Sequence, residues 1–220
     1  MPLEGTLRDR PAADLRLIET LRWEPDTGFV RLPRHLSRLE ASAQALGFAC
    51  ERYLIAAALE AAVSAADCAL RIRLTLDSAG TPDVTTQPFV PLAADVVWTV
   101  LVATTRLSSD DALLRHKTTR RDLYDRARAE FTRDEADEIL LLNERGELCE
   151  GTITTVFLDV GRGPLLTPPL ACGLLAGVLR TEMLENGKAV EAALGEHDLR
   201  SAKAIHVGNS LRGMVRARLR

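Results

Sequence analysis

Apolar and polar residues alternate over residues 15–23 in the manner of a β-strand. The odd positions form one face of this strand, and the even positions, which include Thr20, form the other. The turn-forming residues Asp26-Thr27-Gly28 follow. We therefore predict a hairpin whose second strand covers residues 29–32.

The spacing of apolar residues then changes to the helical period. Residues 33–46 carry leucines and alanines at helical spacing, and Gly47 is a natural end for that helix. Residues 53–66 are rich in alanine and predict a second helix. Residues 70–76 alternate again, with leucine and isoleucine on one face and mainly basic residues on the other, which predicts another strand.

Residues 85–93 separate this region from the rest of the chain. They contain Pro88 and Pro91 and show no regular period, which is typical of a connecting segment. We therefore predict a linker here, between a small α/β domain at residues 1–84 and a larger domain at residues 94–220.

The second region alternates between short strand patterns and helical patterns. The predicted helices cover residues 122–130 and 177–186, and the predicted strands cover residues 96–104, 138–142, 147–149, 152–160, 205–207 and 213–219. The chain contains no internal repeat and no low-complexity segment. We therefore expect an α+β protein of two domains.

The composition is that of an ordinary globular protein and argues against several kinds of partner. Of the 220 residues, 46% are apolar and 27% are charged, and the net charge is -3. The chain has no long block of like charges, so nothing predicts binding to nucleic acid or to a membrane surface. The longest apolar runs, such as residues 54–59, are too short to cross a bilayer.

Two further features indicate a cytoplasmic protein. Residues 1–10 are polar and contain Glu4 and Asp9, unlike a signal peptide. The four cysteines form no CxxC pair and no histidine cluster accompanies them, so we expect no metal site. Reduced thiols in a cytoplasmic protein are the simplest interpretation.

Three separated regions of the chain carry residues that suit one kind of chemistry. They contain His35-Leu36-Ser37-Arg38-Leu39, then His116-Lys117-Thr118-Thr119-Arg120-Arg121, then Glu150-Gly151-Thr152 continuing to Phe157, with Thr167-Pro168-Pro169-Leu170 and Gly173-Leu174-Leu175-Ala176-Gly177-Val178 downstream. In this order they resemble the class IV aminotransferase family, the fold-type IV pyridoxal-phosphate enzymes, over about residues 15–216. The resemblance implies a larger domain with a β-barrel-like core and a homodimer whose active site lies near the interface.

The resemblance also implies roles for three side chains. Lys117 would hold pyridoxal 5'-phosphate as a Schiff base and move the substrate proton, Glu150 would pair with the pyridinium nitrogen, and Arg38 would bind the phosphate. These residue types suit the cofactor, which needs an amine, an acid for its ring nitrogen and donors for its phosphate. Without the resemblance, the same residues would be interpreted as a solvated lysine, a turn glutamate and a helix-surface arginine.

Residues 173–179 begin a predicted helix with small side chains, and a helix N-terminus attracts phosphate. The resemblance implies that the amides near Val178 and Leu179, next to Gly177, hold the phosphate of the cofactor. It also implies that Leu175 packs on the face of the cofactor ring.

One further feature agrees with the family, and two depart from it. Asn209 and Ser210 fall where the family adds a further phosphate contact. Thr155 stands where many relatives carry asparagine, so the hydrogen bond made by that asparagine is not expected in the same form. About fourteen residues precede the first predicted strand, fewer than is usual, so part of the substrate wall is expected to be missing.

The family includes aminotransferases for branched-chain and D-amino acids, and 4-amino-4-deoxychorismate lyase, which releases pyruvate and leaves 4-aminobenzoate. Residues 17–23, followed by Pro25 and Gly28, resemble the lyase part of fused aminodeoxychorismate synthase-lyase chains. Thr20 matches a threonine that lyases place beside the cofactor, although threonine is common on any strand. Residues 207–213 resemble the lyase ending. A lyase is therefore the expected activity, and amino transfer is the alternative.

Arg71 and Arg73 share one face of a predicted strand and are candidates for binding a substrate carboxylate, because a buried arginine needs an anion. The alternative is a basic face in contact with solvent. A catalytically idle relative in which Lys117 is unmodified is a further alternative, and such a protein would lack the absorption band of the cofactor.

Overall fold

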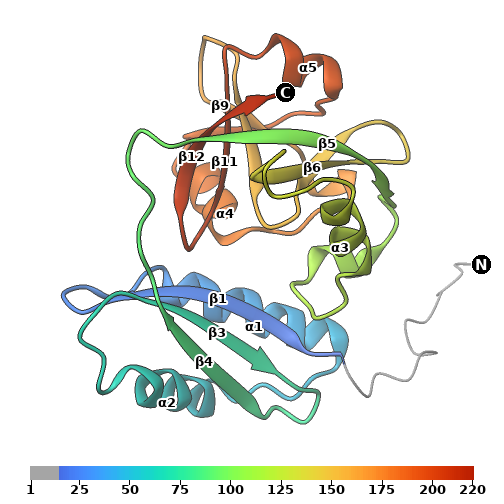
Figure 1. The fold of residues 1–220 in the computed structure, drawn as a ribbon. Coiled ribbons are helices and arrows are strands. Elements are labelled where there is room, and N and C mark those ends of the chain that lie inside the picture. Colours follow the sequence, from blue (N-terminus) through green and yellow to red (C-terminus); the bar gives the residue numbers. More distant parts are fainter. Residues whose placement is uncertain (1–14) are drawn as a thin grey trace, which may run out of the picture.

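The computed structural model describes residues 15–220, which form two sheets with helices packed on them (Figure 1). The smaller sheet belongs to the first part of the chain and the larger sheet to the second part, and residues 89–96 connect them. The expectations about residues 1–10 and about a short N-terminal wall concern residues outside the described range.

The smaller sheet has the strand order β2-β1-β3-β4, and all neighbouring strands are antiparallel. Its strands are β1 (Leu17–Glu24), β2 (Gly28–Phe29), β3 (Leu70–Leu76) and β4 (Pro82–Pro88). Helices α1 (Leu32–Leu46) and α2 (Arg52–Val63) share one apolar cluster with alternate residues of β1 and β3, as the alternation predicts. The other face carries Thr20, Arg71 and Arg73, which line the cavity described below.

Two predicted boundaries in this half were wrong. The predicted linker began at residue 85, but β4 continues to Pro88. This edge strand is mostly exposed and therefore lacks apolar alternation, and an edge strand tolerates the missing N–H of proline. The predicted return strand at residues 29–32 was also too long, since β2 has two residues and Arg31 turns the chain into α1 with a left-handed φ of 60°. The division into two domains stays a prediction.

The larger sheet curls and has the strand order β10-β9-β8-β11-β12-β5-β6-β7. Its strands are β5 (Val97–Leu107), β6 (Glu138–Asn143), β7 (Leu148–Gly151), β8 (Thr155–Asp159), β9 (Leu165–Thr167), β10 (Ala189–Glu191), β11 (Ala204–Asn209) and β12 (Gly213–Leu219). The long strand β5 pairs in parallel with β6 on one side and β12 on the other. Strands β9 and β10 were missed, because three residues are too few to show a period.

Three helices and two short 3-10 helices complete this half. They are α3 (Asp122–Ala129), α4 (Val178–Glu185) and α5 (Glu196–Ser201), with η1 (Ala112–Arg115) and η2 (Leu170–Cys172). Helices α3 and α4 confirm the predicted helices, whereas α5 was missed because it has six residues and buries only Leu199.

Strand β6 shows that both faces of the larger sheet are covered. Leu140 and Leu142 belong to an apolar cluster on one face, and Ile139 and Leu141 belong to a second cluster that includes Ala127 of α3. Such double coverage explains the uninterrupted apolar run in this strand. No helix within residues 15–220 is long and apolar enough to span a membrane.

Candidate active site

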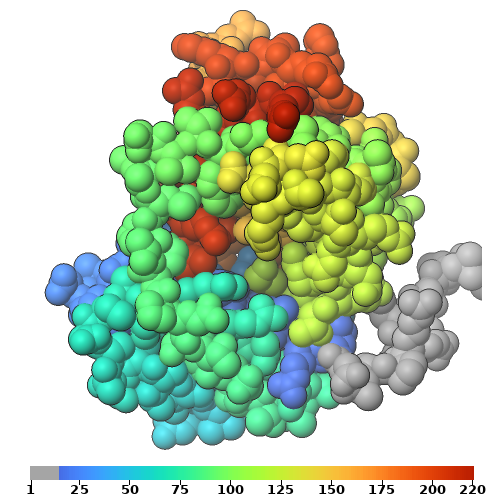
Figure 2. All heavy atoms as spheres, in the orientation of Figure 1, coloured from blue at the N-terminus to red at the C-terminus, as the bar shows by residue number. Residues whose placement is uncertain are grey.

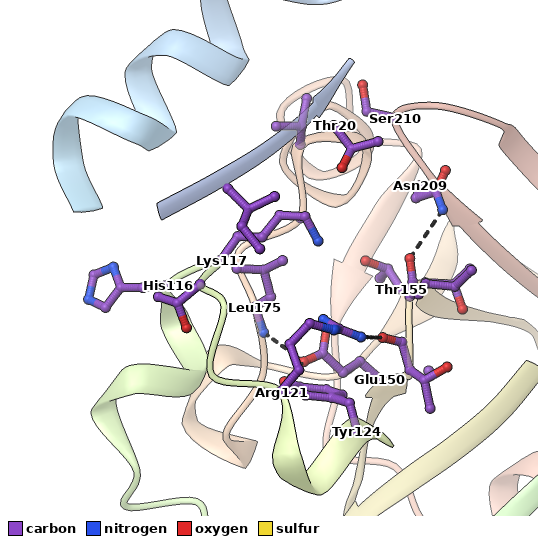
Figure 3. A pocket seen from close by; sticks show the side chains of 18 of the residues that line it. Thr20, His116, Lys117, Arg121, Tyr124, Glu150, Thr155, Leu175, Asn209 and Ser210 are labelled. Atoms are coloured by element: carbon purple, nitrogen blue, oxygen red, sulfur yellow. Dashed lines mark hydrogen bonds between the residues drawn. The ribbon is translucent and has the colours of Figure 1, made fainter. Parts of the chain in front are cut away.

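A cavity of about 600 Å³ lies between the two halves of the chain. The space-filling view shows the surface hollowed where the blue and cyan N-terminal half meets the yellow and red C-terminal half (Figure 2). Every residue proposed for the site from the sequence lines this cavity. Side chains from both halves converge on it, including Thr20, Lys117, Glu150, Leu175 and Ser210 (Figure 3).

Lys117 follows η1 in a segment that docks on β1. Its carbonyl accepts a hydrogen bond from the Ile18 N–H at 2.7 Å, and the amide of Thr119 donates to the Arg16 carbonyl at 2.9 Å. Loss of hydration in the cavity, together with the positive charges of Arg38 and Arg121, lowers the pKa of Lys117 to about 8. A usable fraction of the amine is therefore uncharged near neutral pH, as a nucleophile requires.

Glu150 lies at the end of β7 and is 5% exposed. The Tyr124 hydroxyl donates to its Oε1 at 2.6 Å, and the Leu175 N–H donates to the same atom at 3.2 Å. Burial raises the pKa of Glu150 to about 7, although these two donors and Lys117 oppose the rise. Both donors bind Oε1, so Oε2 is left for a cationic or N–H group in the cavity.

The loop after Glu150 is held by Glu138, a buried carboxylate that the sequence patterns did not identify as a site residue. Glu138 accepts hydrogen bonds from the amide and hydroxyl of Thr152, from the Ile153 amide and from the Thr154 hydroxyl, at 2.5–3.1 Å. A Cβ on Gly151 would lie 2.4 Å from the Thr154 hydroxyl oxygen. The loop therefore requires glycine at this position, and its shape fixes the direction of Glu150.

The N-terminus of α4 opens into the same cavity. Gly177 precedes the helix, no side chain caps its first turn, and Gly177, Val178 and Leu179 line the cavity. A Cβ on Gly177 would lie 2.8 Å from the Thr155 hydroxyl oxygen, so this close approach requires glycine. The first amides of the helix are consequently uncrowded and suited to an anion.

Arg38 reaches this helix from the other half of the chain. Its guanidinium donates to the Ala176 carbonyl at 3.2 Å, and it also donates twice to Glu19, at 2.8 and 2.6 Å. Glu19 is 1% exposed, and the Arg38 guanidinium and the hydrogen bond from His35 outweigh burial and lower its pKa to about 2. This carboxylate fixes Arg38 beside the first turn of α4, an arrangement that the sequence did not indicate.

Asn209 ends β11 and Ser210 begins the turn that follows, and both line the cavity. The Asn209 side chain is used within the protein: its amide donates to the Ile153 carbonyl, and its oxygen accepts from the amides of Leu211 and Arg212. Ser210 is thus the better placed of the two to present a side-chain donor, and Asn209 holds the turn.

A group of arginines lines the cavity without acidic partners. Arg71 and Arg73 form no ion pair within the described residues, and the Arg71 Nε is buried without a hydrogen-bond partner there. Burial and the neighbouring charges of Arg71 and Arg121 lower the pKa of Arg73. Burial and the charge of Arg71 likewise lower the pKa of Arg212. The cavity therefore presents unbalanced positive charge to a ligand.

These features define a fold of the fold-type IV class, with Lys117, Glu150 and an anion cradle formed by Gly177, Val178 and Leu179 around one cavity. The chain belongs to the class IV aminotransferase family, because the "Amino-transferase class IV" sequence profile matches residues 16–219. This family depends on pyridoxal phosphate. The resemblance noted in the sequence is thereby confirmed, and the chain is an enzyme.

Similar proteins carry two kinds of name. A provisionally named aminodeoxychorismate lyase from Schizosaccharomyces pombe is 32% identical over 188 residues, which are 82% of this chain and 80% of that protein. A solved structure from Mesorhizobium loti, provisionally named an amino-acid aminotransferase, is 56% identical with a TM-score of 0.92 over 94% of this chain and 100% of that chain. A solved structure provisionally named 4-amino-4-deoxychorismate lyase is 26% identical with a TM-score of 0.79 over 92% and 84% of the two chains.

Proposed function

We propose that this chain binds pyridoxal 5'-phosphate and that Lys117 holds the cofactor covalently. The observation that carries the proposal is the Lys117 amine, which has a lowered pKa and shares one cavity with the buried carboxylate of Glu150. The cavity also contains an uncapped helix N-terminus whose Gly177 could not carry a Cβ. An amine, an acid and an anion cradle are the three things that this cofactor requires, so the residues fit it.

Bound pyridoxal phosphate supplies an electron-withdrawing ring that makes a proton on the neighbouring substrate carbon acidic. The protein then has four tasks. Lys117 accepts and returns that proton, since its amine titrates near neutral pH. Glu150, whose Oε2 is not used by Tyr124 or Leu175, would keep the ring nitrogen protonated. Arg38, Ser210 and the first amides of α4 would hold the phosphate, and Leu175 would pack on the ring.

We propose that the reaction is lyase-like, the elimination of pyruvate from 4-amino-4-deoxychorismate to give 4-aminobenzoate. Thr20 lies in the cavity with Lys117, as the resemblance to lyases requires. The S. pombe relative has the name of a lyase, and its similarity to this protein extends over most of both chains. The substrate has two carboxylates, and Arg71 and Arg73, which form no ion pair within the described residues, could each donate hydrogen bonds to one of them. Arg212 adds a further positive charge to the same cavity.

The alternative is transfer of an amino group from an amino acid to a 2-oxo acid. The M. loti protein, whose name is that of an aminotransferase, favours it. Both reactions begin with removal of the same proton, and they differ in the step that follows. In the lyase, the electrons from the broken C–H bond would expel a substituent from the next carbon, whereas in the transferase Lys117 would return the proton without loss of that substituent and the amino group would pass to the 2-oxo acid.

The test is to incubate the purified protein with aminodeoxychorismate and, separately, with an amino acid and 2-oxoglutarate. Formation of pyruvate and 4-aminobenzoate in equal amounts supports the lyase, and formation of glutamate supports the transferase. Lys117→Ala should abolish either activity, while Lys203→Ala, which changes an exposed lysine, is the matched control. A protein that yields neither product and shows no cofactor absorption band would be a catalytically idle relative.

We also propose a cytoplasmic homodimer, as the family resemblance implies. Several large apolar side chains are exposed on the single chain, among them Tyr53 at 79% and Val90 at 83%. Sedimentation of the purified protein tests this, with a mass of twice 24.0 kDa expected.

A further inference from the structure

A chain of buried hydrogen bonds connects the smaller sheet to the anion cradle. The His35 Nδ1 lies 2.6 Å from the Glu19 Oε2, and the His35 Nε2 lies 2.7 Å from the Ser210 hydroxyl oxygen. His35 and Glu19 are each 1% exposed and Ser210 is 7% exposed, so water does not compete for these contacts. The sequence placed His35 next to Arg38 in a motif but gave the histidine no role.

The charge of Glu19 determines which group donates in each hydrogen bond of this series. Two Arg38 donors hold Glu19 ionised, with a pKa of about 2. An ionised carboxylate only accepts, so the His35 Nδ1 must carry a proton. The state of the His35 Nε2 then decides what the Ser210 hydroxyl can do. If Nε2 is unprotonated, it accepts the hydroxyl proton of Ser210; if Nε2 is protonated, it donates to the hydroxyl oxygen and frees that proton.

A phosphate dianion in the cradle needs donors, and Ser210 can serve as one only in the second state. We propose that His35 is a positioning residue for the anion: binding of a phosphate group beside α4 goes with protonation of His35, and the imidazolium turns the Ser210 hydroxyl toward the phosphate. This inference rests on the proposed cofactor site and adds to it a proton that is taken up when the phosphate binds.

The surrounding charges agree with this coupling. Glu19 of β1 and Arg38 of α1 balance one another, so protonating His35 without an anion leaves an unbalanced buried positive charge. The other charged groups nearby are Lys117, which interacts with both of them, and Arg31, which joins the Ser210 carbonyl at 3.3 Å to Glu182 of α4 at 2.7 Å. A phosphate dianion adds two negative charges to this set and favours the protonated imidazole.

The first measurement is nitrogen NMR of the protein with ¹⁵N-labelled histidine. The chain has four histidines, and the spectrum of His35→Gln identifies the signal of His35. We expect pyridoxal phosphate, added at constant pH, to convert His35 from the singly to the doubly protonated form, and pyridoxal, which lacks the phosphate, to leave it unchanged. Ser210→Ala should remove the response, because the protonated Nε2 then has no acceptor, and Ser210→Thr should keep it.

The second measurement is the ratio of the affinities for pyridoxal phosphate and pyridoxal between about pH 7 and 9, above the second ionisation of a phosphate ester at about 6. Titration of Lys117 changes the affinities for both ligands by the same factor, so its effect cancels in the ratio. If binding takes up one proton, the ratio should fall with rising pH by up to about tenfold per pH unit. In His35→Gln the side-chain amide can donate to Ser210 at any pH, so the ratio should become independent of pH. Equal slopes in wild type and His35→Gln would overturn the proposal.

Inorganic phosphate added to the cofactor-free protein separates this inference from the proposed function. Protonation of His35 by phosphate, without any cofactor band from pyridoxal phosphate, would support the coupling and refute the cofactor site. A cofactor band without a change at His35 would refute the coupling alone. Absence of both would refute both.

Discussion

At the scale of single residues, the site depends on two groups whose pKa values the fold moves toward neutrality. Lys117 is lowered to about 8 and Glu150 is raised to about 7, in both cases mainly through loss of hydration. Groups with such values can exchange protons near neutral pH, and they cluster at functional sites.

The assignment of Lys117 predicts where the cofactor is attached. Borohydride reduction makes the bond between cofactor and amine permanent, so peptide mapping should find the pyridoxyl label on Lys117. Labelling should become faster as the pH rises through about 8, because the uncharged amine reacts. Label on Lys188 or Lys203, which are exposed, would refute the assignment.

The assignment of Glu150 predicts a catalytic defect without loss of cofactor. Glu150→Gln can still accept the Tyr124 and Leu175 hydrogen bonds but no longer stabilises a protonated ring nitrogen. We expect the cofactor band to remain and kcat to fall by about two orders of magnitude or more, which is the usual contribution of such a proton-holding group. Glu147→Gln, which changes a half-buried glutamate just before β7 that does not line the cavity, is the control, and a Glu150→Gln enzyme with normal turnover would refute the role.

The sequence predicted the site residues that lie in motifs, but it did not predict the residues that hold them in place. Lys117, Glu150 and Arg38 could be proposed because each lies in a motif, and the structure brings them to one cavity. Tyr124 and Glu138 could not, because their partners lie 26 and 14 to 16 residues away and only the folded chain brings them together. The roles of all these residues stay predictions until they are measured.

At the scale of elements, the loop between β7 and β8 owes its shape to one buried carboxylate. Glu138→Gln would lose charge-assisted acceptors for a loop that donates several hydrogen bonds to it. We expect the free energy of unfolding to fall by about 2 kcal/mol or more, at about 1.5 to 3 kcal/mol for a hydrogen bond to a charged group.

Glu135→Gln is a matched change, since Glu135 is exposed and holds only the start of a nearby turn. Chemical denaturation measures both variants. A loss for Glu138→Gln no larger than that for Glu135→Gln would mean that Glu138 does not brace the loop.

Elements with apolar alternation were predicted well, and those without it were not. β1 and β3 pack alternate residues on α1 and α2, so the pattern in the sequence reflects a real interior. β4 is an exposed edge strand and is held by its hydrogen bonds to β3, which leave no trace in the apolar pattern. The three-residue strands β9 and β10 depend in the same way on pairing with neighbouring strands, which the apolar pattern does not show.

At the scale of the whole molecule, Arg38 joins the two halves. It lies in α1, is fixed by Glu19 of β1, and donates to Ala176 just before α4. If it also binds the phosphate, Arg38→Ala should weaken cofactor affinity about ten- to a hundredfold, because a charged hydrogen bond contributes about 1.5 to 3 kcal/mol. Arg38→Lys should recover only part of this loss, since a point charge replaces a planar fork.

The ion pair with Glu19 adds a second consequence of Arg38→Ala. Removing Arg38 leaves Glu19 buried with His35 as its remaining partner, which should also destabilise the cofactor-free protein, by about 3 kcal/mol. The melting temperature should fall further with cofactor than without it, because a bound ligand stabilises only the folded state. Cofactor titration and thermal unfolding of wild type, Ala and Lys variants measure both effects. Equal cofactor affinities in the three proteins would exclude a phosphate contact.

The connection at residues 89–96 is nearly all exposed, and Val90 is 83% exposed. A protease that cut there would leave two fragments held by non-covalent contacts, among them the Arg38 and His35 hydrogen bonds and the docking of the Lys117 segment on β1. A ligand that binds to both fragments would then add to these contacts and slow the separation of the fragments. The lifetime of the nicked complex would consequently measure occupancy of the site, even for a ligand that is never turned over.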